Sequence, residues 1–277
     1  MRDCWQVNVY GNTKICQDYL FKDNKEVVQA FSTRLGGVSQ HYYSSLNMGL
    51  HVGDDPNEVI RNRKIFSDYL EIPVEDWVTL NQIHSDKVVK VTARHKGKGS
   101  LDLKTVIAEA DAMITDAVGS PLVTFYADCI PVYIFDPVQK AIGLAHAGWR
   151  GAYSGIALKT IMNMQQEYGS RVSNLLISIG PGIGQCCYQV DEHIYSVTNE
   201  KYPNYLKKIL IPDEKNKWLL NLKLLLWLQL TDAGIKEKNI SVSSFCTQCH
   251  HDVFFSYRGD QGKTGRMAAL FMLKENL

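Results

Sequence analysis

The hydrophobic positions of the chain fall into short runs and into longer periodic stretches. The short runs are rich in β-branched and aromatic residues and are bounded by Asp, Pro or Gly, a pattern typical of buried strands. They are VVKVTA (88–93), PLVTFYA (121–127), PVYIFD (131–136), AIGLAH (141–146) and NLLISIG (174–180). The pattern predicts a largely buried β-sheet built from the middle of the chain.

Three stretches have helical periodicity. Residues 55–70 combine an acidic start and an early proline with apolar residues at Val59, Phe66 and Leu70, which share one helix face. Residues 154–169 show the same period and end at Gly169, a common helix stop. Residues 218–234 (WLLNLKLLLWLQLTDAG) are apolar on most faces, so we expect a third helix packed in the core.

Strands and helices mix without a regular βαβ rhythm, and no Rossmann, Walker or nucleophile-elbow motif is present. This favours an α+β or irregular layered α/β fold over a doubly wound sheet. Turn signals are scattered, and no linker or repeat divides the chain. We therefore expect one domain over residues 1–277.

The net charge and the length of the apolar segments limit which classes of partner and which location we expect. The 30 Lys and Arg against 29 Asp and Glu leave a net charge of +1, which supplies no broad attraction to nucleic acid or to an anionic membrane. The start of the sequence lacks the features of a secretory signal, and the most apolar window is interrupted by Asn221, Lys223 and Gln229. The expected location is the cytoplasm.

Residues with reactive side chains stand at the ends of the apolar runs. Cys129 follows one run, His146 ends another, and His84 follows Trp77–Leu80. Strand ends meet at one edge of a sheet, so these three residues can converge on a zinc ion without any short motif. Three protein ligands would leave one coordination position for water, as in hydrolytic sites.

Other interpretations of these residues remain open. Taken singly, a cysteine or histidine at a strand end is often an ordinary buried residue. Cys129 is alternatively a nucleophile activated by His146. Asp128 is a candidate for orienting a histidine or, equally, a turn residue. Arg150 precedes a helix expected near Ala152, where it would hold a phosphate or make a surface ion pair.

The seven cysteines are an odd number, so we expect reduced thiols rather than a disulfide framework. Cys186 and Cys187 are too close in sequence for an easy disulfide, and we expect one of them to face the core. The segment CTQCHHD (246–252) resembles a metal knuckle, but no suitably spaced second ligand pair lies nearby. We therefore expect no metal at that segment.

A series of motifs resembles the laccase-domain, or YfiH-like, family, whose members are purine nucleoside enzymes also labelled polyphenol oxidase and peptidoglycan editing factor. The motifs run in the family's order from about residue 32 to about residue 267. They are STRLGGVS, SLNMGLHVGDDPNEVIRNR, NQIHS, DAMIT, ADCIPV, AHAGWRG, SIGPGIGQCCYQV and FFSYRGDQGKTGR.

The resemblance implies a single-domain layered α/β sandwich with irregular, non-Rossmann connectivity, and zinc held by His84, Cys129 and His146. The implied activities are phosphorolysis of adenosine, inosine, guanosine and S-methyl-5′-thioadenosine, and hydrolytic deamination of adenosine. Purine nucleosides and phosphate are the expected partners of a monomer or homodimer. For deamination, Asp128 is our candidate proton shuttle.

The resemblance also suggests substrate contacts. Asn47 is a candidate for binding the purine or ribose, or else it forms an Asx turn before Gly49. Candidate phosphate ligands are the arginines within the matching motifs: Arg34, Arg63, Arg150, Arg258 and Arg266. In one departure, Gly259 replaces the second arginine of the family's Ser-Tyr-Arg-Arg sequence, so phosphate or a partner surface would be bound differently.

Two further functions compete with this one. A metal-free cysteine hydrolase or amidase would use Cys129 and His146, which suits the peptidoglycan-editing label. A copper-dependent polyphenol oxidase would need paired HxH motifs, and none of the eight histidines forms one. Copper at the zinc site remains possible as an adventitious source of such activity.

Overall fold

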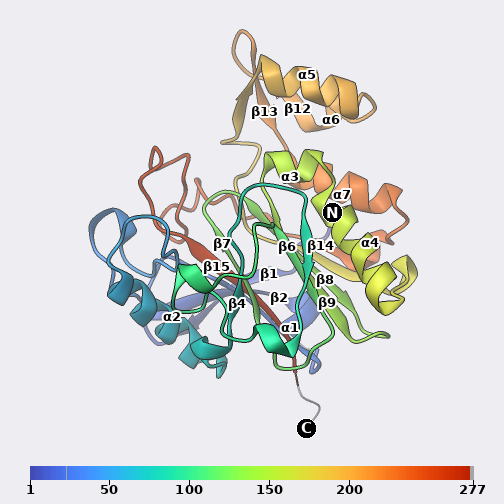
Figure 1. Ribbon diagram of the computed structural model, residues 1–277. Coiled ribbons are helices and arrows are strands. Elements are labelled where there is room, and N and C mark those ends of the chain that lie inside the picture. Colours follow the sequence, from blue (N-terminus) through green and yellow to red (C-terminus); the bar gives the residue numbers. More distant parts are fainter. Residues whose placement is uncertain (23, 275–277) are drawn as a thin grey trace.

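Two sheets packed face to face form the centre of the protein (Figure 1). The computed structural model describes residues 1–22 and 24–274, and within them each of these two sheets has six strands. One sheet has the order β1 (Trp5–Tyr10), β2 (Thr13–Asp18), β3 (Val27–Ser32), β15 (Met267–Leu273), β7 (Leu122–Tyr126), β4 (Val78–Thr79). The other has the order β14 (Ile240–Val242), β10 (Leu176–Ile179), β8 (Ile130–Asp136), β9 (Ala141–Ala147), β6 (Ala112–Thr115), β5 (Val88–Lys90).

Strand β8 shows why the predicted strands read as unbroken apolar runs. Its alternate residues Val132 and Ile134 belong to a core beneath helices. The residues between them, Tyr133 and Phe135, belong to the core between the two sheets. Because successive side chains point to opposite faces and both faces are covered, every position of the strand is buried, and all but the last, Asp136, are apolar or aromatic.

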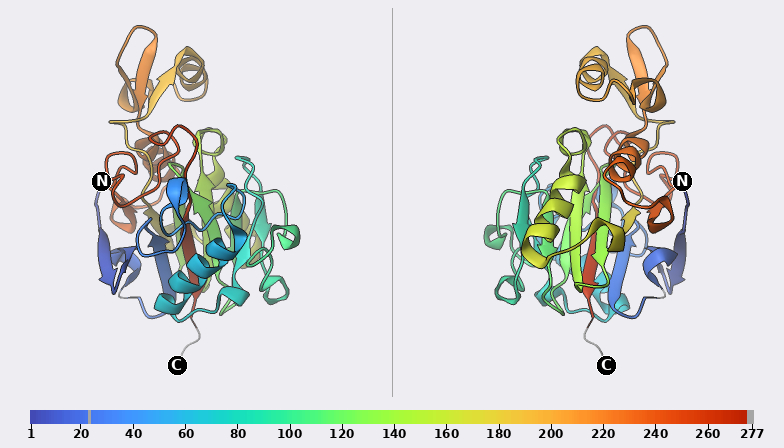
Figure 2. Two further views of the ribbon diagram at one scale, coloured as in Figure 1. Left: turned by 90° about the vertical axis from the view of Figure 1, so that its left-hand side faces the viewer. Right: turned by 90° about the vertical axis from the view of Figure 1, so that its right-hand side faces the viewer.

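Helices cover both outer faces of the sandwich, as the two side views show (Figure 2). Helices α3 (Trp149–Tyr153), α4 (Ile156–Tyr168) and α7 (Leu222–Asp232) pack on the sheet that contains β8 and β9. Helix α2 (Pro56–Leu70) packs through Phe66 on the other sheet. The short helix α1 (Tyr19–Lys22) follows β2. The result is a four-layered α/β/β/α arrangement.

The first two predicted helices are confirmed. Helix α2 begins after Asp55, whose side chain accepts a hydrogen bond from Asn57 N at 2.8 Å. Its Val59 and Phe66 are fully buried, whereas Leu70 is only partly buried. Helix α4 ends at Gly169, whose φ of 71° lies in the left-handed region that glycine adopts without strain.

The third predicted helix is too long at its start. Residues 217–220 form strand β13 (Lys217–Leu220), which pairs with β11 (Gln189–Asp191) and β12 (Leu210–Pro212). Helix α7 begins only after Asn221, whose side chain accepts a hydrogen bond from Leu224 N at 3.0 Å. Strand pairing and this cap override the apolar pattern of Trp218–Leu220.

The three-stranded sheet β11-β13-β12 projects from the sandwich together with α5 (Glu192–Lys201) and α6 (Leu206–Ile209) (Figure 1). In the main sheets, the parallel pairs β4/β7, β5/β6 and β10/β14 interrupt otherwise antiparallel order. The expected α+β class, single layered domain and irregular connectivity are confirmed. None of the helices within the described residues has the length and apolar composition needed to cross a membrane.

Candidate metal centre and cavity

Two of the connections that cross from one main sheet to the other meet at the same end of the sandwich. The connection from β4 to β5 carries His84, and the short connection from β7 to β8 carries Cys129. His146 is the penultimate residue of β9, whose last residue Ala147 pairs with Ile130 directly after Cys129. Two inter-sheet connections and one strand end therefore bring the three residues together.

The geometry of this His-Cys-His group fits a metal ion. His84 Nε2 lies 3.8 Å from Cys129 Sγ, and the ligand atoms of all three residues lie within 4.8 Å of one another. Tetrahedral zinc with its usual bond lengths to sulfur and nitrogen would separate such a pair by about 3.6 Å. The imidazole rings of His84 and His146 meet edge to face at 4.9 Å between centroids. The residues present therefore fit zinc.

Asp111 holds both histidines in place. Its Oδ1 lies 2.8 Å from His146 Nδ1 and accepts a hydrogen bond from His84 N at 3.0 Å. The other carboxylate oxygen accepts from the Ser85 hydroxyl and from the Ser85 and Ile83 backbone amides. Because Nδ1 of His146 is occupied by Asp111, its Nε2 is the atom left for a metal.

Electrostatics favour the anionic form of Cys129. Burial opposes ionisation, but His146 and then His84 outweigh it and lower the pKa of the Cys129 thiol to about 6. Burial likewise opposes protonation of His146, yet Cys129 and Asp111 raise its pKa to about 9. The group thus contains the thiolate that metal coordination or nucleophilic catalysis requires.

Gly148 packs directly against the group. A Cβ atom at Gly148 would lie 2.8 Å from His84 Cδ2 and 3.1 Å from Cys129 Sγ. Its φ of −71° and ψ of 171° suit alanine, so the Gly148→Ala variant suffers crowding rather than backbone strain. We expect about tenfold weaker zinc binding with little change in the melting temperature.

The control for this prediction is Gly155→Ala. Gly155 has a φ of 76°, but its added Cβ would meet nothing within 4 Å. That variant should lose stability and keep its zinc affinity, measured by competition with a chromophoric chelator. Equal zinc affinities in the two variants would show that Gly148 does not shape the site.

The three residues open into a cavity of about 790 Å³, a size that suits a small-molecule ligand. Aromatic and cationic side chains share its wall. They include His51, Phe125, Trp149, Arg150, Tyr188, Tyr257, Arg258 and Arg266.

Asp128 is not placed as predicted. Although it borders the cavity, its Oδ1 accepts hydrogen bonds from the Thr247 and Ser256 hydroxyls at 2.6 and 2.8 Å. Its Oδ2 accepts from Arg258 N at 2.7 Å. Because both oxygens are engaged with the segment after β14, Asp128 anchors that segment instead of orienting a histidine. Asp111 does the orienting.

The two predicted substrate-binding residues do not line the cavity. Arg63 is fully buried, donates to the carbonyl oxygens of Met48, Gly99 and Ser100, and stacks at 4.5 Å on Phe125. The Oδ1 atom of Asn47 accepts from Gly49 N at 3.0 Å, which is the Asx turn considered as its alternative. Internal hydrogen bonds therefore use both polar side-chain atoms of Asn47, and the Nε and Nη1 atoms of Arg63 but not its buried Nη2.

Of the five candidate phosphate ligands, Arg150, Arg258 and Arg266 line the cavity. Arg150 is exposed and its guanidinium lies 4.6 Å from the centre of the Trp149 ring. The helix that contains it starts at Trp149, and not near Ala152 as predicted. Arg34 instead donates to Ser44 and His251 carbonyl oxygens. The unusual Gly259 is exposed and lies outside the cavity lining.

Asp111 is the functional residue that sequence reasoning missed. It opens the motif DAMIT and directly precedes β6, which pairs with the strand of His146. The sequence signal for Asp111 was its position directly before a strand, since that strand lies beside the one that ends in the predicted ligand His146. The expectation that Cys186 or Cys187 faces the core also fails, since Cys186 is exposed and Cys187 half-buried; both thiols are free, as expected.

Comparison with known proteins agrees with the site. The sequence model of a family described as multi-copper polyphenol oxidoreductase laccase matches residues 28–274. Purine nucleoside phosphorylase YlmD of Bacillus subtilis strain 168 is 37% identical over 254 residues, covering 92% of this chain and 91% of the relative. A protein from an unknown prokaryotic organism, adenosine deaminase RL5, is 28% identical and covers 86% of this chain and 91% of itself.

The fold is shared as well. The crystal structure of YlmD from Geobacillus stearothermophilus matches with a TM-score of 0.92 and 36% identity, covering 99% of this chain and all of that one. The matching profile, relatives and structure all extend over most of the chain. The chain therefore belongs to the laccase-domain, or YfiH-like, family of enzymes.

Proposed function

We propose that this protein is a zinc-dependent purine nucleoside enzyme. Its activities would be phosphorolysis of adenosine, inosine, guanosine and S-methyl-5′-thioadenosine, and hydrolytic deamination of adenosine. The observation that carries the proposal is the His84-Cys129-His146 group opening into a cavity of nucleoside size. The names of the two relatives, purine nucleoside phosphorylase and adenosine deaminase, support the two reactions.

Each of these residues would have a distinct task. His84, Cys129 and His146 would hold the zinc, and Asp111 would fix the orientation of His146 and of the His84 backbone. Bound there, zinc would supply Lewis acidity and lower the pKa of a coordinated water. The aromatic rings of Tyr188 and Tyr257 on the cavity wall offer faces against which a purine can stack.

Phosphate would bind among the arginines. Arg150, Arg258 and Arg266 lie in a lining where, among the residues that the structure describes, Asp128 is the only carboxylate, and that carboxylate accepts three hydrogen bonds. Guanidinium groups pair readily with phosphate oxygens. The excess of positive charge therefore favours an anionic co-substrate.

The test is to incubate the purified protein with adenosine and to separate products by chromatography, with and without phosphate. We expect adenine and ribose 1-phosphate when phosphate is present, and inosine when it is omitted. The Arg258→Gln and Arg266→Gln variants should raise the KM for phosphate about tenfold or more. Arg61→Gln, on the exposed face of α2, is the matched control. Absence of purine products would reject the proposal.

A second candidate rests on the order Asp111-His146-Cys129, which is also the order of a cysteine hydrolase triad. His84 distinguishes the two candidate functions, because a cysteine hydrolase triad of Asp111, His146 and Cys129 does not require it. The His84→Ala variant should lose the zinc of the His-Cys-His group, and with it purine turnover, if the first proposal holds. A variant that cleaves amide substrates at the wild-type rate would support the hydrolase.

We also propose residence in the cytoplasm. All seven cysteines are free in the structure, which suits a reducing compartment.

A further inference from the structure

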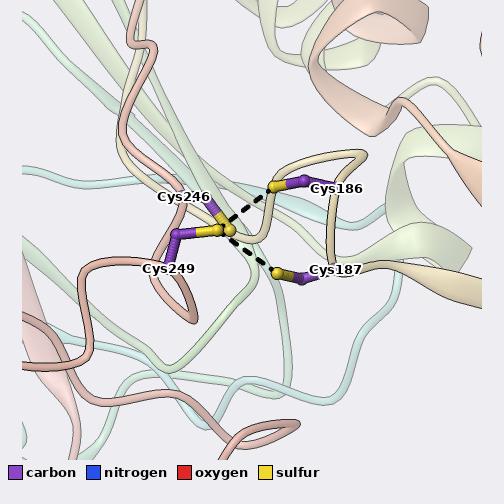
Figure 3. A group of neighbouring side chains, drawn as sticks. All are labelled: Cys186, Cys187, Cys246 and Cys249. Atoms are coloured by element: carbon purple, nitrogen blue, oxygen red, sulfur yellow. Dashed lines mark hydrogen bonds between the residues drawn. The ribbon is translucent and has the colours of Figure 1, made fainter.

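Four cysteines outside the His-Cys-His group converge from two distant parts of the chain. Cys186 and Cys187 lie in the loop after β10, and Cys246 and Cys249 lie in the loop after β14 (Figure 3). Strands β10 and β14 are parallel neighbours, so their carboxyl-terminal ends, and the loops that follow them, lie at the same end of the sheet. A bridge between Gly182 and Cys246 continues this pairing into the loops.

The sulfur atoms point at one common centre (Figure 3). Cys249 Sγ lies 3.4 Å from both Cys186 Sγ and Cys187 Sγ, and all four sulfurs lie within 4.8 Å of one another. Zinc bound tetrahedrally by four thiolates would place its sulfurs about 3.8 Å apart. A disulfide would need about 2.05 Å and would leave two of the four thiols without a role.

Backbone donors prepare Cys246 for an anionic state. Gly184 N donates to Cys246 Sγ at 3.1 Å, and the Cys249 amide donates to the same sulfur. Amides directed at a ligand sulfur are typical outer-shell contacts of a thiolate metal site.

A buried cation lies beside the cluster. The Lys223 ammonium donates to the Ser243 and Phe245 carbonyl oxygens at 2.9 and 2.6 Å, next to Cys246 in sequence. Burial lowers the pKa of Lys223 to about 8, and Cys246 and Cys186 act in the opposite direction. Four thiolates around a dication leave two negative charges in excess, which a neighbouring ammonium partly balances.

We propose that Cys186, Cys187, Cys246 and Cys249 form a second metal centre, a tetrathiolate site that binds a structural zinc ion. Four protein sulfurs close the coordination sphere, so the site has no position for water or substrate. It differs in this respect from the His-Cys-His group, which has three ligands. The expectation of no metal at CTQCHHD rested on the lack of a second ligand pair, and Cys186 and Cys187 supply such a pair in the structure.

The centre would fix one wall of the cavity. Thr247, between two of the ligands, donates its hydroxyl to Asp128, and Ile183 N donates to the Asp128 carbonyl at 2.8 Å. Tyr188, directly after Cys187, lines the cavity. A metal that joins the two loops therefore positions Asp128, the neighbour of Cys129, from both sides.

The experiment measures zinc per chain in protein purified without added metal, using variants that separate the two centres. Cys129→Ser should retain about one zinc ion per chain, and Cys129→Ser combined with Cys249→Ser should retain none. Cys4→Ser, outside both groups, should match wild type. This design is independent of the proposed function, because Cys129→Ser isolates the second centre whether or not the first binds zinc.

A second measurement covers the case in which Cys249→Ser fails to fold. Cobalt added to the metal-free Cys129→Ser protein should give the visible spectrum of tetrahedral cobalt with four thiolates, and zinc should displace it. The proposal is overturned if Cys129→Ser retains no metal and cobalt gives no such spectrum. It is equally overturned if the mass of the native chain shows a disulfide among these cysteines.

Discussion

Replacing Cys129 by serine is expected to lower kcat/KM for adenosine phosphorolysis by about 1000-fold or more. Serine preserves the size of the side chain, but its hydroxyl does not ionise near neutral pH and is a poor zinc ligand. The residue is only partly buried and lies in a connection between sheets, so the fold should be retained. Zinc content and initial rates measured on one preparation test this expectation.

The matched control is Cys4→Ser, a partly buried cysteine that belongs to neither metal group. It should keep wild-type zinc content and turnover. If Cys129→Ser retained more than about a tenth of the wild-type rate, Cys129 would be neither an essential ligand nor a nucleophile. Both candidate functions would then need other residues.

Replacing Asp111 by asparagine is expected to weaken zinc binding and to lower kcat/KM by about 10- to 100-fold. Asparagine can still accept one hydrogen bond, but its amide nitrogen cannot accept the bonds that Ser85 and Ile83 donate to Oδ2. The loss of negative charge also weakens the hold on His146. Competition with a chelator measures the affinity, and steady-state kinetics measures the rate.

Asp116→Asn provides the control, since Asp116 is an exposed aspartate just past the other end of β6. It should behave as wild type in both assays. Because Asp111 acts through the histidines, zinc affinity must fall along with the rate. An Asp111→Asn variant with lower thermal stability but unchanged zinc affinity would reduce Asp111 to a structural role.

The sequence predicted the buried strands well, because β8 and β9 are covered on both faces and are therefore apolar at most of their positions. Prediction failed where pairing partners are distant. Residues 217–220 look helical, yet β11 and β12 recruit them into a sheet. No local pattern indicates such a pairing.

The candidate site, like the fold, was predicted only where the sequence gives a local signal. Strand ends suggested His84, Cys129 and His146, but His84 lies in a connection between sheets, and its approach to Cys129 depends on both crossings. Asp128, next to Cys129 in sequence, was considered either for orienting a histidine or as a turn residue, whereas the histidines are oriented by Asp111, which directly precedes a neighbouring strand. The sequence did not indicate that Cys186 and Cys187 lie beside Cys246 and Cys249, because the two pairs are about sixty residues apart.

The most direct test of the central claim is to remove the metal with a chelator, to measure adenosine phosphorolysis, and to measure it again after zinc is returned. We expect the metal-free protein to be inactive, and zinc to restore turnover in the wild type but not in His84→Ala. Wild-type turnover by a chain shown by elemental analysis to hold no metal would contradict the account.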